Sequence, residues 1–331
     1  PSRSLPGSAG RDAPRESAHI VTSLIEEDGL SAMAKHAIAA PPAPSSADDA
    51  RSPVRLVLRV ALPILLVIAG LAVMLYPVVA TQVNNMRQNE VVNDYLTELE
   101  NRDPVENLRA VADARHYNDT RTQAPILDPW LARVSEDNHD YQEYLTHLAD
   151  GPAMAHLKVP SIGVSIPVYH GTTEEVLQKG VGHLYGSSLP VGGDGTHAVL
   201  TGHTGLSTAT LFDNLTDVRE GDEIFVNTYG EKLKYVVHDI TVVEPTEVDT
   251  LAEVLGEDLL TLVTCTPYGI NTHRLLVTGH RVPLDEDGRS FDRDGLHWQW
   301  WMILAIALAV AVLAALIWWL RKIVKNNKEN R

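Results

Sequence analysis

The residues of this chain with the clearest chemical potential surround its single cysteine, Cys265. A run of β-forming residues, 259–264, leads into Cys265, and after a loop rich in Pro and Gly a second such run begins at Arg274. If the two runs pair as neighbouring strands, Cys265 and Arg274 lie close together at one end of a sheet. A thiol beside a fixed guanidinium is a candidate nucleophile with an anion-binding partner. A lone cysteine in an arbitrary protein is more often a buried structural residue, so the rest of the chain must decide.

A candidate acid–base partner for this thiol is His203, in the segment Thr201-Gly202-His203-Thr204-Gly205. It ends a predicted strand and opens a glycine-rich loop. A nucleophilic thiol needs a base within hydrogen-bond reach or an imidazolium that stabilises the thiolate, and histidine suits either role. The chain contains fourteen histidines, so this position alone is weak support for a catalytic role.

Charge and composition exclude several classes of function. The net charge is −16, and residues 81–296 carry fifteen basic and thirty-five acidic side chains. Such a surface repels phosphates, which argues against a nucleic-acid partner. One cysteine excludes an intramolecular disulfide and cysteine-rich metal sites, and no His-x-x-x-His pair occurs. We therefore expect no metal and no cofactor.

Two apolar stretches, residues 60–80 and 298–320, are long enough to cross a bilayer. The second has tryptophans at both ends, as an interfacial aromatic belt requires. Basic residues precede the first stretch and follow the second: Arg51, Arg55, Arg59, Arg321, Lys322, Lys325, Lys328 and Arg331. The positive-inside rule therefore predicts a two-pass protein of the cell membrane, with both termini in the cytoplasm and residues 81–296 outside.

The pattern of the remaining chain predicts a helical stem followed by a β-rich domain. Helical spacing in 82–115 is broken at Asp103-Pro104, which predicts two helices, and a further helix is expected at 141–148. From residue 156 onward the chain has short β-forming runs separated by glycine-rich turns, which favours a closed barrel or a sandwich. The seven predicted strands are 156–159, 164–170, 198–203, 223–228, 232–243, 259–264 and 274–282.

The predicted organisation has seven segments. They are a disordered cytoplasmic tail (1–52), a first transmembrane helix (53–80), an extracellular helical stem with a loop (81–150), a β-rich domain (151–284), a linker (285–296), a second transmembrane helix (297–320) and a basic cytoplasmic tail (321–331).

Several of these motifs together resemble the sortases. The residues that carry the resemblance are Thr261-Leu-Val-Thr-Cys265, Arg274 nine positions later, and Thr201-Gly-His203 upstream. Tyr76-Pro77, Asp128-Pro129-Trp130, Gly182-His183-Leu184, Gly186-Ser187-Ser188-Leu189-Pro190 and the second apolar stretch are similar to class C, the pilin-polymerising branch of Gram-positive bacteria. The resemblance extends from about residue 75 to residue 320.

This resemblance implies a fold and a reaction. The fold would be an eight-stranded β-barrel, here 151–284, with N-terminal helices and a lid loop, flanked by two transmembrane helices. The enzyme would cut Leu-Pro-x-Thr-Gly-like sorting signals between Thr and Gly and pass the acyl group to a pilin lysine amine. Cys265 would be the nucleophile, His203 the general acid–base, and Arg274 the group that holds the substrate carbonyl or the oxyanion.

The same resemblance implies that Asp128, Pro129 and Trp130 form a lid over the cleft. Asp128 would pair with Arg274, and Trp130 would cover Cys265. A cover makes physical sense because a reactive thiol outside the cell is open to oxidation.

Three alternatives remain open at the level of sequence. The first is a sortase that anchors surface proteins to cell-wall peptidoglycan, and the second is a cysteine hydrolase that passes the acyl group to water. The third is a catalytically silent membrane scaffold that keeps the fold.

Overall fold

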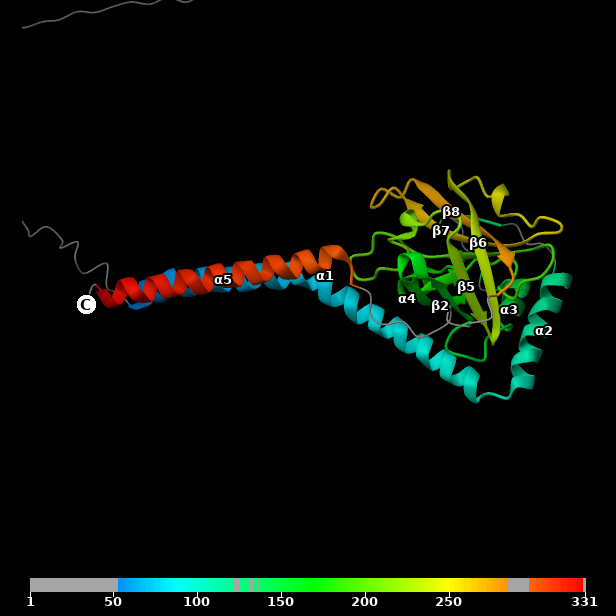
Figure 1. The fold of residues 1–331 in the computed structure, drawn as a ribbon, viewed down its shortest axis with the longest axis horizontal. Coiled ribbons are helices and arrows are strands. Elements are labelled where there is room, and N and C mark those ends of the chain that lie inside the picture. Colours follow the sequence, from blue (N-terminus) through cyan, green and yellow to red (C-terminus); the bar gives the residue numbers. More distant parts are fainter. Residues whose placement is uncertain (1–52, 122–125, 131–133, 136, 285–297, 330–331) are drawn as a thin grey trace, which may run out of the picture. The chain divides into compact units, whose positions relative to one another are not determined.

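The computed structural model of the protein describes residues 53–121, 126–130, 134–135, 137–284 and 298–329. The predicted tail 1–52 and linker 285–296 lie outside these residues. Two long helices bound the described chain, α1 (Pro53–Asn101) and α5 (Trp300–Glu329) (Figure 1). Both are long and apolar enough to cross a membrane. The most apolar segments of α1 and α5 have mean hydropathies of 2.5 and 2.8. Helix α1 continues without a break past residue 80, where the first apolar stretch ends.

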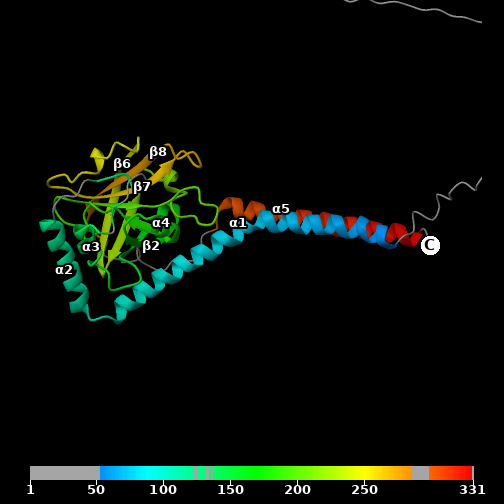
Figure 2. The same ribbon diagram turned by 180° about the vertical axis from the view of Figure 1, so that it is seen from behind.

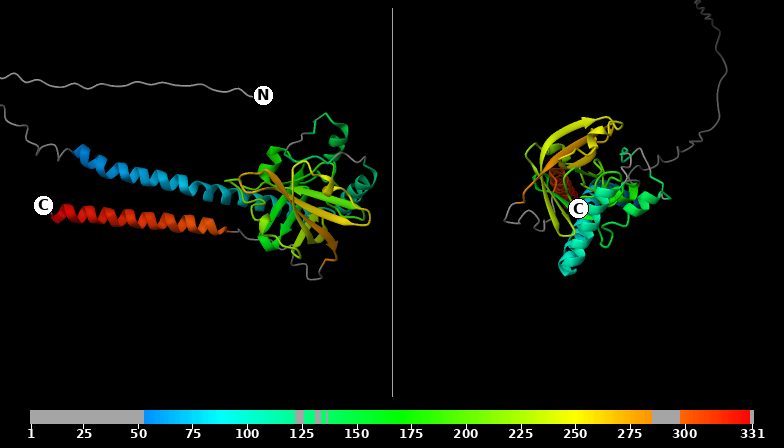
Figure 3. Two further views of the ribbon diagram at one scale, coloured as in Figure 1. Left: turned by 90° about the horizontal axis from the view of Figure 1, so that it is seen from above. Right: turned by 90° about the vertical axis from the view of Figure 1, so that its right-hand side faces the viewer.

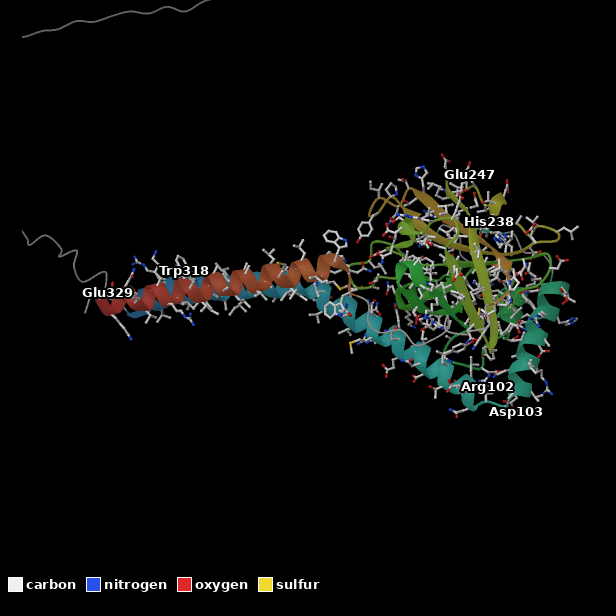
Figure 4. The ribbon with its side chains drawn as sticks, viewed as in Figure 1. Arg102, Asp103, His238, Glu247, Trp318 and Glu329 are labelled. Carbon is white, nitrogen blue, oxygen red and sulfur yellow. The ribbon has the colours of Figure 1, made fainter. Side chains whose placement is uncertain are left out.

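The stem contains a second helix, α2 (Pro104–Thr120), which begins at the predicted Asp103-Pro104 break. Arg102 and Asp103 lie at the turn between α1 and α2 (Figure 4). The Asp103 side chain caps α2 by accepting a hydrogen bond from the backbone N–H of Val105, and Pro104 fits the first turn because its missing N–H has no helical partner there.

Eight strands form a closed barrel in the order β1-β2-β3-β4-β7-β8-β6-β5 (Figures 1 and 3). This confirms the predicted eight-stranded β-barrel. The β-forming runs in the sequence predicted seven of these strands and missed β3, which is only three residues long. The strands are β1 (Ala155–Val159), β2 (Val164–His170), β3 (Val181–His183), β4 (Thr196–Thr201), β5 (Glu223–Thr228), β6 (Glu231–Val243), β7 (Asp258–Thr266) and β8 (His273–Val282).

Shorter elements decorate the barrel. They are the helices α3 (His139–Tyr144) and α4 (Glu174–Lys179), and the 3-10 turns η1 (Pro160–Ile162), η2 (Leu215–Asp217) and η3 (Asp249–Leu251). Strand β8 lies between β6 and β7, so the pair that carries Cys265 and Arg274 is anchored on both sides (Figure 2).

Helix α1 is fastened to the barrel through Tyr95. Its hydroxyl donates to the Asn227 carbonyl at 3.2 Å and accepts from the Tyr229 N–H at 2.8 Å. The ring is fully buried in the main apolar core. A buried hydroxyl with both partners satisfied fixes the helix in one register against the strands.

A buried polar pair braces β3. The Tyr144 hydroxyl lies 2.9 Å from His183 Nδ1, and His183 Nε2 lies 2.8 Å from the Ser188 carbonyl. Burial lowers the pKa of His183 to about 3, so its imidazole is neutral. The Gly182-His183-Leu184 motif therefore has a structural role, which its histidine performs as a hydrogen-bonding group.

Candidate active site

Strands β7 and β8 are antiparallel, and their register places Cys265 directly opposite Arg274. This is the pairing expected from the two β-forming runs. Both side chains are buried, Cys265 at 6% and Arg274 at 5% exposure, and the cysteine is a free thiol. The loop between the strands thus brings a thiol and a guanidinium, nine residues apart in the chain, to one end of the sheet.

His203 follows β4, which runs parallel to β7 with Thr201 beside Val263. The backbone next to His203 is tied to the cysteine strand by two hydrogen bonds: Gly202 N–H donates to the Val263 carbonyl at 3.1 Å, and the Thr264 hydroxyl donates to the Gly202 carbonyl at 2.7 Å. His203 is therefore positioned by the same strand that carries Cys265.

Glycine is required at position 202 by close packing. A Cβ there would lie 2.7 Å from the ring of Phe212, closer than side-chain carbons approach one another. The Phe212 N–H in turn donates to the His203 carbonyl at 3.0 Å. The packing of the Phe212 ring and this backbone hydrogen bond thus both fix the position of His203.

The loop after His203 is organised by Asp213, a residue that the sequence did not single out. Its carboxylate accepts from the Gly205 N–H at 2.7 Å and from the Thr204 hydroxyl at 3.3 Å. Burial raises the pKa of Asp213, while these two hydrogen bonds oppose the rise.

Asp128 binds Arg274 with both carboxylate oxygens. The Arg274 Nε donates to Oδ2 at 2.7 Å, and Nη2 donates to Oδ1 at 3.1 Å. The remaining guanidinium nitrogen, Nη1, donates to the carbonyls of Asn271 and His273. Every nitrogen of the guanidinium therefore has a partner, and its charge is balanced by one carboxylate.

Trp130 lies over the same guanidinium. The ring centroid is 4.7 Å from Arg274 Cζ, a cation–π distance, and the indole N–H donates to His203 Nδ1 at 3.4 Å. Its ring also packs on the smaller of the two apolar core clusters. The backbone N–H of Trp130 donates to Asp128 Oδ1 across the buried Pro129, so the three loop residues form one compact turn.

The electrostatics of this arrangement keep the thiol protonated. Burial raises the pKa of Cys265, Arg274 lowers it, and the Asp128 carboxylate raises it again. The thiolate is the nucleophilic form, so the side chains that surround Cys265 hold it in its less reactive state.

Glu174, at the start of α4, is a further residue of the site that sequence reasoning missed. Its Oε2 lies 3.4 Å from His203 Nε2. The signal for its helix start is present in the sequence, since Thr173 caps α4, but nothing in the sequence links it to His203.

Comparison with known proteins gives one consistent result. A family model described as the sortase domain matches residues 157–282. Sortase C-1 from Actinomyces oris is 56% identical, with 54% of this chain and 99% of that chain covered at a TM-score of 0.53. The chain belongs to the sortase family. Sortase A from Corynebacterium diphtheriae is 46% identical, covering 64% and 100% at a TM-score of 0.56. Sortase C of Streptococcus pneumoniae is 39% identical, covering 59% and 97% at 0.54.

As a sortase, this protein is a cysteine transpeptidase that acts on sorting signals. The structure brings all six predicted site residues together, as Cys265, Arg274, His203, Asp128, Pro129 and Trp130 form one continuous set of contacts. Within the described part of the chain, no group of three or more His, Cys, Asp or Glu side chains is arranged to hold a metal ion.

Proposed function

We propose that this sortase joins pilin subunits, with Cys265 as nucleophile, His203 as general acid–base and Arg274 as the anion-binding group. The observation that carries the assignment is the cross-strand pair of Cys265 and Arg274, with His203 tied to the same strand. A single cysteine in the chain leaves no second candidate for the thiol.

In the first step, the Cys265 thiol gives its proton to His203, and the sulfur attacks the carbonyl of the Thr in a Leu-Pro-x-Thr-Gly-like signal. The Thr–Gly amide bond breaks, His203 passes the proton to the departing Gly amine, and a thioester remains on Cys265. Arg274 binds the substrate carbonyl oxygen, and this interaction strengthens as negative charge develops on the oxygen.

In the second step, a lysine amine of the next pilin attacks the thioester. His203 takes up a proton from that amine and returns it to the sulfur, so that a new amide bond forms, the thioester C–S bond breaks and the Cys265 thiol is regenerated. Polymerisation rather than hydrolysis requires the amine to reach the thioester before water does.

The loop 128–130 acts as the lid of this cleft. Asp128 occupies two donors of Arg274, so the carbonyl of a substrate must displace it before the guanidinium is available. Trp130 must leave at the same time because it lies on the guanidinium and bonds to His203. Substrate binding and lid closure thus compete for the same atoms.

The choice of pilin over cell-wall acceptors rests on similarity and on the lid. The structure of S. pneumoniae sortase C is described as giving insight into catalysis and pilin substrate specificity, and the match covers 97% of that chain and 59% of this one. The lid, which the resemblance associates with the pilin-polymerising branch, points the same way: its Asp128 is paired with Arg274.

We further propose that α1 and α5 cross the membrane, with both termini in the cytoplasm and the barrel outside. Both helices are long and apolar enough, and basic residues lie at the N-terminal end of α1 and at the C-terminal end of α5. Because Cys265 is the single cysteine, a membrane-impermeant maleimide is expected to label intact cells that carry Trp130→Ala. The matched control, Asn326→Cys in a Cys265→Ala background, is expected to react only after lysis; labelling of that control in intact cells contradicts the topology.

The transpeptidase assignment is tested with the full chain in detergent. Trp130→Ala protein is incubated with a Leu-Pro-x-Thr-Gly peptide, with and without a lysine-containing pilin peptide, and analysed by mass spectrometry. We expect a thioacyl adduct on Cys265 that converts to an amide-linked product when the pilin peptide is present. An adduct that water alone resolves would identify a hydrolase, and transfer only to a peptidoglycan stem peptide would identify a wall-anchoring enzyme. Cys265→Ala is the blank.

A further inference from the structure

We propose that Glu174 is a positioning residue for the acid–base histidine: it holds His203 by Nε2 and stabilises the imidazolium that acyl transfer requires. This rests on the proposed role of His203. The carboxylate Oε2 lies 3.4 Å from Nε2, which is an ion-pair distance, and Nε2 itself is buried and has no hydrogen-bond partner among the described residues. The imidazole is 14% exposed and the Glu174 side chain 53%, so the contact lies at the edge of the site.

The two nitrogens of His203 have different neighbours, and this fixes where the proton sits. An indole N–H only donates, so Nδ1 must accept from Trp130 and carries no proton while the lid is closed. The single proton of the neutral ring is then on Nε2, which faces Glu174. With the lid closed, Nδ1 therefore accepts from the Trp130 indole, and Nε2 faces the Glu174 carboxylate.

Opening the lid changes the protonation that His203 can adopt. Once Trp130 leaves, Nδ1 is available for a second proton, and the resulting imidazolium has Glu174 beside its other N–H. Nδ1 is then the nitrogen that exchanges protons with substrate, and Nε2 is the nitrogen that is held. The arrangement has the logic of a catalytic triad, in which a carboxylate orients the base and stabilises its charged form.

The neighbours of Glu174 leave its Oε2 directed toward His203. The Gln178 side chain donates to the other oxygen, Oε1, at 2.9 Å, and Thr173 caps the first turn of α4. Glu174 thus has its two oxygens directed to two different partners. Its neighbour Glu175 instead pairs with Lys179 at 2.5 Å and is 80% exposed.

The other charged groups near His203 are already engaged. Arg274 is balanced by Asp128, and Asp213 is bound by Gly205 and Thr204 in the loop that follows His203. Within the described residues, Glu174 is the carboxylate that forms an ion-pair contact with the imidazole. Removing its charge therefore disfavours the imidazolium without disturbing the balance at Arg274.

The test compares Glu174→Gln with Glu175→Gln in the full chain carrying Trp130→Ala, so that the lid does not limit the rate. Both changes remove one charge from the same turn of α4 at constant shape. Transfer of the sorting peptide to the lysine peptide is followed from pH 5.5 to pH 9. We expect Glu174→Gln to be about two- to fivefold slower at pH 7.5, the range for a half-exposed ion pair.

The pH dependence separates a charge effect from a structural one. The rate of Glu174→Gln is expected to recover toward that of the parent as the pH falls, because a higher proton concentration offsets the lost carboxylate, so the basic limb of its profile moves to lower pH. Glu175→Gln is expected to keep the parent profile. Equal profiles for both variants, or a loss for Glu174→Gln of the same factor at every pH, overturn the proposal.

The same experiment distinguishes failure of the proposed function. If the parent forms no thioacyl adduct, the transpeptidase assignment fails, and the role of Glu174 fails with it. If the parent and Glu175→Gln both transfer the acyl group and His203→Gln does not, the function stands, and the comparison of Glu174→Gln with its neighbour decides the inference alone.

Discussion

Asp128 and Arg274 come from segments 146 residues apart, yet they form a buried, two-pronged ion pair at the centre of the site. Each side chain of the pair is about 5% exposed. A buried charge whose partner is removed is strongly disfavoured, so the pair is stable only while both members stay in place. Arg274 therefore holds the lid closed, and it is also the residue proposed to bind the substrate carbonyl.

The first prediction concerns access to the thiol. Asp128→Ala leaves the guanidinium unpaired, and Trp130→Ala removes the ring above it, so both changes favour the open lid. We expect Cys265 to react with a small alkylating reagent at least roughly tenfold faster in each variant, the factor that about 1.4 kcal/mol produces. Asp140→Asn, an exposed acidic residue on α3, serves as control. Unchanged rates in both lid variants would refute the lid.

The second prediction concerns the pH at which the thiol reacts. In the closed site, burial and the Asp128 carboxylate raise the pKa of Cys265, and Arg274 lowers it. Asp128→Asn removes one raising group and exposes the thiol, while the lowering effect of Arg274 remains. Since the thiolate reacts, the midpoint of alkylation against pH is expected to move to lower pH. A midpoint that stays in place would show that Asp128 does not affect this thiol.

The strand pair at the centre of this site was predictable because it is local, whereas the lid was predicted only from the resemblance. The strand pair around Cys265 follows from two β-forming runs that flank a Pro and Gly loop, and antiparallel pairing fixes the rest. The break at Asp103-Pro104 is equally local, since proline and its preceding residue stop a helix.

The features that were missed depend on long-range contacts. Strand β3 has three residues and owes its conformation to β2 and β4 on either side, so no run of β-formers marks it. Glu174 meets His203 only because α4 packs beside the loop after β4. Asp213 is likewise recognised only from the loop that it ties together.

The third prediction concerns Gly202. Alanine at this position places a Cβ 2.7 Å from the Phe212 ring, so either the ring or the His203 backbone must move. We expect the free energy of unfolding to fall by about 1–3 kcal/mol, the usual cost of overpacking, and acyl transfer to be lost. Adding Phe212→Leu makes room for the methyl group and is expected to restore part of the activity. Thermal denaturation and the transfer assay test both parts, and a fully active Gly202→Ala would contradict them.

The fourth prediction concerns stability in acid. His183 is neutral in the fold because burial lowers its pKa to about 3, whereas the unfolded chain takes up a proton near pH 6.5. The unfolded state therefore binds more protons between these values, and stability is lost as the pH falls through this window. The loss approaches about 1.4 kcal/mol per pH unit for one such group.

His183→Gln removes this titration. We expect the variant to be less stable at pH 7.5, because the contact with Tyr144 is weakened, but to lose less stability between pH 6.5 and pH 4.5. His170 and His197, whose pKa values burial also lowers, keep their own contributions. Urea unfolding at several pH values measures the slope, and an equal slope in both proteins would contradict the assignment.

Helix α1 runs without interruption from its apolar part to Tyr95, which fastens it to the barrel. The stretch between residue 80 and Tyr95 is roughly 22 Å long at the helical rise of about 1.5 Å per residue. Under the proposed topology, this helix would act as a spacer that sets the height of Cys265 above the membrane surface. A substrate that is itself tethered to the membrane would then be selected by reach as well as by sequence, since its cleavage site must rise to the same height on its own tether.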